Sequence, residues 1–248
     1  MDKKEIDKIV EWIKNYVASA KANGVVLGMS GGKDSFVVAK LCTLAVGCDN
    51  VFGVIMPNGE MQDLTDAITS CESLNIKYEV INISDAYNGV IEKIKPTLEK
   101  QGKPLSDIST INTAPRIRMT TLYAIAGSLN YLVANTSNLS EASVGYTTKW
   151  GDNVGDFAPI ANFTKTEVCE IGIDLGLEKS LVEKTPSDGL SGKSDEDKLG
   201  ITYASLDNLI RNGEKGQDYE RIMYLNKISA HKRIGVAKYE NNLKNTLK

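Results

Sequence analysis

Histidine and cysteine are scarce in this chain of 248 residues, which contains one histidine and four cysteines. No two of the cysteines have the C-x-x-C spacing of a metal-binding pair, so we do not expect a zinc site. Cysteines without that pairing are typical of reduced side chains in a cytosolic protein core. We therefore expect a cytoplasmic protein.

Long apolar runs and an excess of positive charge are also missing. No apolar run approaches the ~20 residues that a membrane span requires. The charged segment from Met1 to Val10 does not resemble a signal peptide. The net charge is −3 and the pI is near 5.4, so no basic field favours nucleic acid. We expect neither a membrane nor a nucleic acid as partner.

The most informative stretch runs from Val25 to Ala39. It opens with an apolar run typical of a buried strand, continues through Ser30, Gly31 and Gly32, and enters an apolar helix expected over Phe36 to Val46. A helix start offers unpaired N–H groups and a positive dipole end, and glycines let a ligand approach the backbone. The stretch therefore predicts a phosphate cradle.

Other interpretations of this stretch are less specific. A Gly-Gly pair alone would indicate an ordinary strand-to-helix turn. The spacing fits neither a Walker A loop nor a G-x-G-x-x-G dinucleotide fingerprint.

Strand and helix signals alternate along the rest of the chain, which predicts a single domain, residues 1–248, of the α/β class. We expect a doubly wound parallel sheet covered by helices on both faces. The expected strands are Val25–Met29, Val51–Met56, Tyr78–Ile83 and Tyr131–Val133. The expected helices are Glu5–Ala20, Phe36–Val46, Asp63–Leu74, Ser84–Lys100 with an interruption near Pro96, Thr113–Ser128, one starting at Thr164 as a capping box with Glu167, Tyr203–Asn212 and Asp218–Ala230. Polar segments at Gln101–Ser109 and Thr185–Lys198 are expected as loops, the second one mobile, and the tail from Asn241 as frayed.

The six residues S-G-G-K-D-S from Ser30 to Ser35 resemble the PP-loop, S-G-G-x-D-S, of the ATP pyrophosphatases. That resemblance implies an adenine nucleotide alpha-hydrolase-like fold and cleavage of ATP between its α- and β-phosphates. It also implies that Asp34 meets Mg²⁺. The loop implied to bind ATP comprises Gly28, Met29, Ser30, Gly31, Gly32, Lys33, Asp34 and Ser35.

Further motifs follow in order and cover nearly the whole chain. Together they resemble the ammonia-dependent NAD synthetases. These motifs are A-P-R-I-R-M-T-T-L-Y (114 to 123), T-S-N-L-S-E-A-S-V-G-Y-T-T-K-W-G-D (136 to 152), P-I-A-N-F-T-K-T-E-V (159 to 168), P-S-D-G-L (186 to 190), D-E-D-K-L-G-I (195 to 201) and H-K-R (231 to 233).

The resemblance implies roles for individual residues. It implies that Thr136, Lys165 and Ser187 contact ATP, and that Glu141 joins Asp34 as a ligand of Mg²⁺. Asp34, Glu141 and Lys165 are the implied catalytic residues. The residues implied to bind deamido-NAD are Arg116, Lys149, Asp156, His231 and Lys232. The family is homodimeric and converts deamido-NAD, ATP and ammonia to NAD, AMP and pyrophosphate through an adenylated intermediate. Because water competes with ammonia for that intermediate, we expect the loop Thr185–Lys198 to close over it.

Several alternatives stay open at this point. Arg116 and Arg118 lie two apart on one expected helix, so one can face a ligand while the other forms a surface ion pair. The charged residues from Thr136 to Lys165 also fit a solvated surface, and His231 a surface imidazole. Asn135 stands where relatives more often have glycine, and we expect it to keep a left-handed turn. Alternative functions are a tRNA-modifying ATP pyrophosphatase and a nucleotide sensor without turnover.

Overall fold

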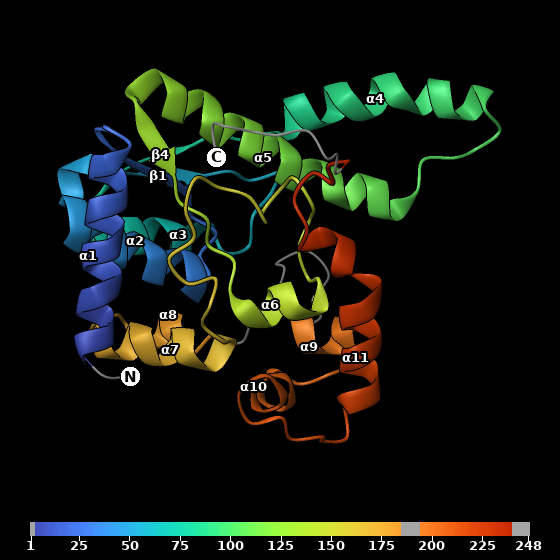
Figure 1. Ribbon diagram of the computed structural model, residues 1–248. Coiled ribbons are helices and arrows are strands. Elements are labelled where there is room, and N and C mark those ends of the chain that lie inside the picture. The colour runs from blue at the N-terminus through green and yellow to red at the C-terminus, as the bar shows by residue number, and fades with distance from the viewer. Residues whose placement is uncertain (1–2, 185–193, 240–248) are drawn as a thin grey trace.

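Four parallel strands form one sheet in the computed structural model, which describes residues 3–184 and 194–239. The strands lie in the order β3-β2-β1-β4. After β3 the chain therefore returns to the other side of β1, where β4 lies beside it (Figure 1). Val25 pairs with Val51 on one side and with Leu132 on the other. The strands are β1 (Gly24–Gly28), β2 (Val51–Ile55), β3 (Lys77–Val80) and β4 (Tyr131–Val133). The predicted parallel sheet is confirmed, and ligands in such sheets bind where the strand order switches.

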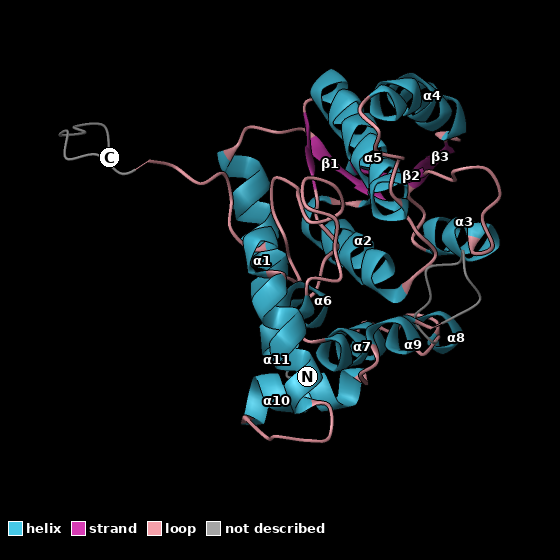
Figure 2. Ribbon diagram, turned by 90° about the vertical axis from the view of Figure 1, so that its right-hand side faces the viewer, coloured by secondary structure: helices cyan, strands magenta, loops and turns pink. Residues whose placement is uncertain are grey.

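Helices cover both faces of the sheet, as the alternation of elements predicts (Figure 2). Side chains of β1 alternate between two cores: Val25 and Leu27 face one, and Val26 faces the other. The first core packs against α1 (Lys3–Ser19), α2 (Lys33–Val46), α3 (Leu64–Ser73) and α7 (Lys165–Asp174); the second packs against α4 (Ser84–Lys100) and α5 (Asp107–Leu129).

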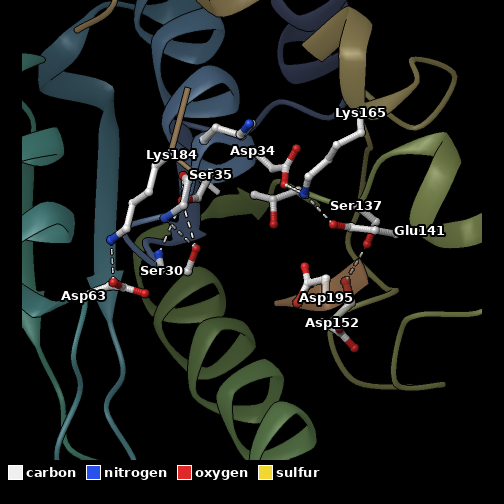
Figure 3. Close-up of a pocket in the computed structure, with 14 residues that line it drawn as sticks. Ser30, Asp34, Ser35, Asp63, Ser137, Glu141, Asp152, Lys165, Lys184 and Asp195 are labelled. Atoms are coloured by element: carbon white, nitrogen blue, oxygen red, sulfur yellow. Dashed lines mark hydrogen bonds and ion pairs between the residues drawn. The ribbon is translucent and has the colours of Figure 1, made fainter. Parts of the chain in front are cut away.

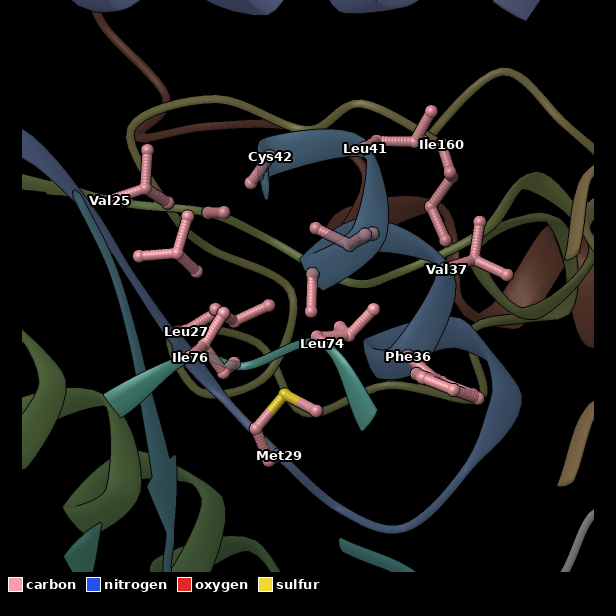
Figure 4. Close-up of a cluster of buried hydrophobic side chains, with 14 of the residues drawn as sticks. Val25, Leu27, Met29, Phe36, Val37, Leu41, Cys42, Leu74, Ile76 and Ile160 are labelled. Atoms are coloured by element: carbon pink, nitrogen blue, oxygen red, sulfur yellow. The ribbon is translucent and has the colours of Figure 1, made fainter. Parts of the chain in front are cut away.

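The larger core lies directly under the loop between β1 and α2 (Figure 4). Met29 and Phe36 flank this loop, and both are 2% exposed. Phe36, Val37 and Leu41 of α2 pack with Leu27 of β1 in the same cluster. Because both ends of the loop are anchored in close-packed side chains, the loop backbone between them is held in place.

Two helix predictions in the first half of the chain are wrong in detail. α4 runs through Pro96 without a break. The carbonyl that Pro96 cannot bond belongs to Glu92, which is exposed, so water can satisfy it. α5 begins at Asp107, within the expected loop, because the Ser106 side chain caps it by accepting a hydrogen bond from the Ser109 amide.

The C-terminal part adds a small helical layer with its own core, shown at the bottom of Figure 1. The predicted capping box of Thr164 and Glu167 is present at the start of α7, and the predicted helix Tyr203–Asn212 is α10. The remaining elements are α6 (Leu139–Val144), α8 (Lys179–Val182), α9 (Asp195–Leu199), α11 (Tyr219–Ile228) and the 3-10 turns η1 (Cys48–Asn50) and η2 (Ala230–Lys232).

Part of the expected loop Thr185–Lys198 is helical, because α9 begins at Asp195; residues 185–193 and the tail from 240 lie outside the described ranges. Within the described ranges, no helix combines the length and the apolar character needed to cross a bilayer.

Candidate active site

The loop that joins β1 to α2 is shaped by a glycine that no other residue can replace without strain. Gly31 has a φ of 78°, in the left-handed region. A Cβ at this position would lie 2.5 Å from the carbonyl oxygen of Asp63 and 2.8 Å from its Cβ. The start of α3 therefore packs directly on the loop backbone, and this close approach requires glycine.

Two serines brace the same loop from inside. The Ser35 hydroxyl donates to the Gly32 carbonyl at 2.9 Å and accepts from the Ser30 amide at 3.3 Å. Gly32 is the N-cap of α2 and provides no side-chain cap. The first turn of α2 thus presents its amides and its positive dipole end to the adjacent cavity, as predicted for a phosphate cradle.

Three charged side chains meet beside this loop. Lys165 Nζ lies 2.6 Å from an oxygen of Asp34 and 2.7 Å from an oxygen of Glu141 (Figure 3). Asp34 is in the first turn of α2, Glu141 in α6 and Lys165 at the start of α7, 131 residues from Asp34. Asn138, the N-cap of α6, donates to the other oxygen of Asp34. The fold therefore unites the three residues that the resemblance implies are catalytic.

Burial and charge act in opposite directions on this cluster. Burial alone would lower the pKa of Lys165, but Asp34 and Glu141 outweigh it and raise that pKa well above its ordinary value. Burial raises the pKa of Glu141, and the charge of Asp34 adds to this rise while Lys165 opposes it. Lys165 therefore stays positively charged, held between two carboxyl groups.

Two adjoining cavities open at the carboxyl ends of the strands. The smaller, of about 260 Å³, is lined by five carboxylates and three lysines together with the loop. The larger, of about 720 Å³, includes apolar side chains such as Val54, Met56 and Leu122. Ser30, Gly32, Asp63, Thr136 and Asp152 line both, so the two are continuous. A charged pocket joined to a partly apolar one can take a ligand with an anionic end and an apolar end.

The predicted ATP-binding residues converge on these cavities. Those of them that lie in the described ranges each line one or both: Gly28, Met29, Ser30, Gly31, Gly32, Lys33, Asp34, Ser35, Thr136 and Lys165. Ser187 lies outside the described ranges.

The residues predicted to bind the dinucleotide are arranged differently. Lys232 lines the larger cavity, where its Nζ donates to the carbonyls of Gly145 and Thr147 at 2.7 Å. Neither cavity is lined by Arg116, Lys149 or His231, which are linked on the surface by two successive hydrogen bonds. Arg116 Nε donates to the Lys149 carbonyl at 3.2 Å, and Lys149 Nζ donates to the His231 carbonyl at 2.6 Å.

Asp156, the fifth of these residues, also lines neither cavity. One oxygen of Asp156 accepts from the Val133 amide of β4 at 2.7 Å, and the other accepts from the Tyr123 hydroxyl at 3.3 Å. These bonds tie the end of β4 to α5.

Asn135 differs from expectation, because its backbone is not among those with positive φ in the described chain. Its side chain donates instead to the carbonyls of Asp152 and Val154, at 2.8 and 2.9 Å. Here asparagine crosslinks the loop that follows β4, so the left-handed turn predicted for it is wrong.

Sequence reasoning missed several residues that line the cavities. Of the two arginines, Arg118 is the one that faces the larger cavity, with its Nε donating to the Met56 carbonyl at 2.9 Å, whereas the resemblance had implied a binding role for Arg116. Its spacing of two from Arg116 could have identified it. Lys184 lines the smaller cavity and bridges Asp63 and Asp66, the former at 2.5 Å. No local pattern marks that lysine.

Comparisons with known proteins point to one family. A family model described as NAD synthase matches residues 5–246. The NH(3)-dependent NAD(+) synthetase of Archaeoglobus fulgidus is 42% identical over 239 residues, covering 93% of this chain and 94% of the relative.

Two solved structures are also similar over the whole fold. The NMN synthetase of Francisella tularensis has a TM-score of 0.86 and 34% identity, covering 97% of this chain and 98% of that one. The NH3-dependent NAD synthetase of Campylobacter jejuni has a TM-score of 0.77 and 30% identity, covering 97% and 100%. With the loop, the charged cluster and the two cavities in place, these matches show that the chain belongs to the NAD synthase family.

Proposed function

We propose that this chain is a carbon–nitrogen ligase that amidates deamido-NAD with ATP and ammonia, giving NAD, AMP and pyrophosphate. A carboxylate oxygen of the nicotinate attacks the α-phosphorus of ATP, and the bond to the β-phosphate breaks. Ammonia then attacks the acyl carbon of this adenylate, the bond to AMP breaks, and one proton is released. The observation that carries the proposal is the meeting of Asp34, Glu141 and Lys165 beside the amides of the α2 loop.

The chain's own residues supply most of the electrostatics of the first step. Negative charge builds on the departing pyrophosphate, and the loop amides, Lys33 and Lys165 line the pocket in which we place it. Donors fixed in advance by folding stabilise such charge without reorganising. The larger cavity, with its apolar wall, would receive the adenosine.

Mg²⁺ is proposed as the metal, with Asp34 and Glu141 as its protein ligands. Both carboxylates approach a single nitrogen, that of Lys165, at 2.6 and 2.7 Å, so they are close enough to share one cation. In the described residues no cluster of three or more His, Cys, Asp or Glu is placed to hold a metal. One or two carboxylates completed by phosphate oxygens and water is the donor set that Mg²⁺ prefers. When bound, the ion would neutralise phosphate charge.

A homodimer is also proposed. Arg116, Lys149 and His231, which the resemblance implies bind the dinucleotide, are linked on the surface outside both cavities. Ile108 and Ile111 of α5 are 67% and 66% exposed, and Ile111 lies at the edge of the larger cavity. A second copy covering this region would bury those side chains and bring its own nucleotide to the exposed cations. Sedimentation analysis of the purified chain tests this: a monomer at micromolar concentration contradicts it.

The cytoplasm is the proposed location, because all four cysteines are free thiols. Ammonia, ATP and deamido-NAD are the proposed small-molecule partners. Family membership disfavours the tRNA-modifying alternative, and a sensor would bind ATP without releasing pyrophosphate.

The decisive assay incubates the purified chain with ATP, Mg²⁺ and ammonium chloride, and supplies either deamido-NAD or nicotinate mononucleotide. The second substrate is included because the Francisella relative is named for NMN. We expect NAD and AMP in equal amounts, dependent on ammonium and faster with the dinucleotide. ADP as product, or preference for the mononucleotide, contradicts the proposal.

A further inference from the structure

Asp207 of α10 is a buried carboxylate whose hydrogen-bond partners lie on two other helices. It is 6% exposed. One of its oxygens accepts from the Ser140 hydroxyl of α6. The other accepts from the Thr166 amide of α7 at 2.9 Å and from the Thr166 hydroxyl at 2.7 Å. Because α10 packs against both of these helices (Figure 1), a single side chain ties the starts of α6 and α7 together.

Both partners of Asp207 are sequence neighbours of residues in the charged cluster. Ser140 precedes Glu141, and Thr166 follows Lys165. The Ser140 hydroxyl also accepts a hydrogen bond from the Lys165 amide at 2.9 Å. A hydroxyl has one proton and two lone pairs, so it can donate to Asp207 and accept from Lys165 at once. The segment that carries Glu141 is thereby bonded to the backbone of Lys165, and Asp207 orients the hydroxyl that joins them.

The first turn of α7 shows why a carboxylate is tolerated at this buried position. The amides of Lys165, Thr166 and Glu167 each donate to a side chain, and Asp207 is the one charged acceptor among the three. A buried carboxylate is costly unless hydrogen bonds and opposite charge compensate it. Three donors and the positive end of the α7 dipole supply that compensation. Since these amides are occupied, what α7 offers to the cavity is the side chain of Lys165.

We propose that Asp207 is a positioning residue for the ligase reaction, which sets the placement of Glu141 relative to Lys165 by holding Ser140 and Thr166. The inference rests on the proposed function, which uses the charged cluster and leaves Asp207 without a role. Asp207 lines neither cavity, so it acts through these contacts and does not touch substrate. Buried charges often add little stability, whereas a displacement of about 1 Å at reacting groups can cost about a hundredfold in rate.

Three substitutions break the contacts to different extents. Asp207→Ala removes all three hydrogen bonds, and we expect kcat for NAD formation to fall about tenfold to a hundredfold. The KM values for ATP and deamido-NAD should change less than about threefold, because the loss falls on the transition state. Asp207→Asn keeps a carbonyl oxygen that can accept from Thr166, and it should restore kcat to within about threefold of wild type. Ser140→Ala breaks the bond to the Lys165 amide and should resemble Asp207→Ala.

The double variant shows whether the two residues act through one contact. If they do, kcat of Ser140→Ala/Asp207→Ala should lie within about twofold of the slower single variant. Leu206→Ala is the matched structural control, because Leu206 is the neighbouring residue of α10 and is fully buried in the core of the C-terminal layer. It should lower the urea midpoint of unfolding, yet leave kcat per folded molecule within about twofold of wild type.

Hydrogen exchange at the start of α7 measures the contact without turnover. The Thr166 amide should exchange at least about tenfold faster in Asp207→Ala than in wild type, since it loses a charged acceptor. Leu206→Ala should leave that exchange rate unchanged. An unchanged rate in Asp207→Ala overturns the inference, because the carboxylate then does not hold the helix.

The kinetic outcomes separate this inference from the proposed function. If wild type forms NAD and Asp207→Ala keeps its kcat, or loses no more than Leu206→Ala, the positioning role is overturned and the proposed function stands. Should Asp207→Ala fail to fold, Ser140→Ala is compared with Leu206→Ala by the same criterion. If wild type forms no NAD from deamido-NAD, the proposed function fails and the positioning role fails with it.

Discussion

Replacing Gly31 by alanine should destabilise the protein and displace the phosphate loop together. The left-handed backbone, with φ of 78°, costs an alanine about 1 to 2 kcal/mol. The new Cβ would lie 2.5 Å from the Asp63 carbonyl oxygen, and overpacking of this kind costs about 1 to 3 kcal/mol more. Alanine also lowers the conformational entropy of the unfolded chain, which offsets the loss of stability by about 0.4 to 1 kcal/mol. The net loss of unfolding free energy should be about 1 to 4.6 kcal/mol.

Alanine substitutions at two other glycines separate the backbone strain from the Cβ contact. Gly59 has a φ of 84°, and a Cβ added to it would meet nothing within 4 Å, so Gly59→Ala carries the backbone strain alone. Gly32 has a φ of −93° and its Cβ would meet only the Ser30 hydroxyl at 3.3 Å, so Gly32→Ala should cost less than about 1 kcal/mol in stability. Urea unfolding at constant m-value measures all three.

Activity provides the second readout for the same set. To relieve the contact, Gly31→Ala must push the start of α3 away from the loop or move the loop amides. The rate of pyrophosphate release should therefore fall by more than the decrease in the folded fraction of the protein. Gly59→Ala should retain activity. If Gly31→Ala unfolds at the same urea concentration as Gly59→Ala and keeps full turnover, the close approach of Asp63 does not constrain the loop.

Three further predictions concern the cavities and the helix that holds Lys165. Asp34→Ala and Glu141→Ala should each lower turnover at least about a hundredfold while the circular dichroism and unfolding curves stay close to wild type; an unchanged rate in either contradicts its role as metal ligand. Arg118→Ala should raise the KM for ATP more than about tenfold through loss of a charged contact in the larger cavity, about 1.5 to 3 kcal/mol. Arg116→Ala, outside both cavities, should leave that KM unchanged, and equal KM values in the two variants would contradict the distinction. Thr164→Ala should lower the unfolding free energy by about 1 to 2 kcal/mol by removing the capping box of α7, and urea unfolding measures it; no change would show that the cap contributes nothing.

The sequence predicts the sheet and the phosphate loop because their signals are local. The apolar run before Ser30 and the glycines after it are read from neighbouring residues, and β4 and α10 begin and end where the pattern places them. Short helices escaped prediction for a physical reason. α6, α8 and α9 are four to six residues long, too short to show helical periodicity or to be stable alone.

The candidate site depends on contacts that no spacing reveals. Lys165 and Asp34 are 131 residues apart, and their contact follows from how α7 packs on α2. The resemblance to NAD synthetases supplied both residues as catalytic, but it did not predict that they contact each other.

The central claim is that AMP passes to a carboxyl group of the substrate, and an oxygen-transfer measurement tests it most directly. Deamido-NAD whose carboxylate carries the heavy oxygen isotope is converted with ATP, Mg²⁺ and ammonium, and the products are analysed by mass spectrometry. One labelled oxygen should appear in AMP and one in the amide of NAD. Heavy oxygen in inorganic phosphate or pyrophosphate, or formation of NAD together with unlabelled AMP, would contradict an adenylated intermediate.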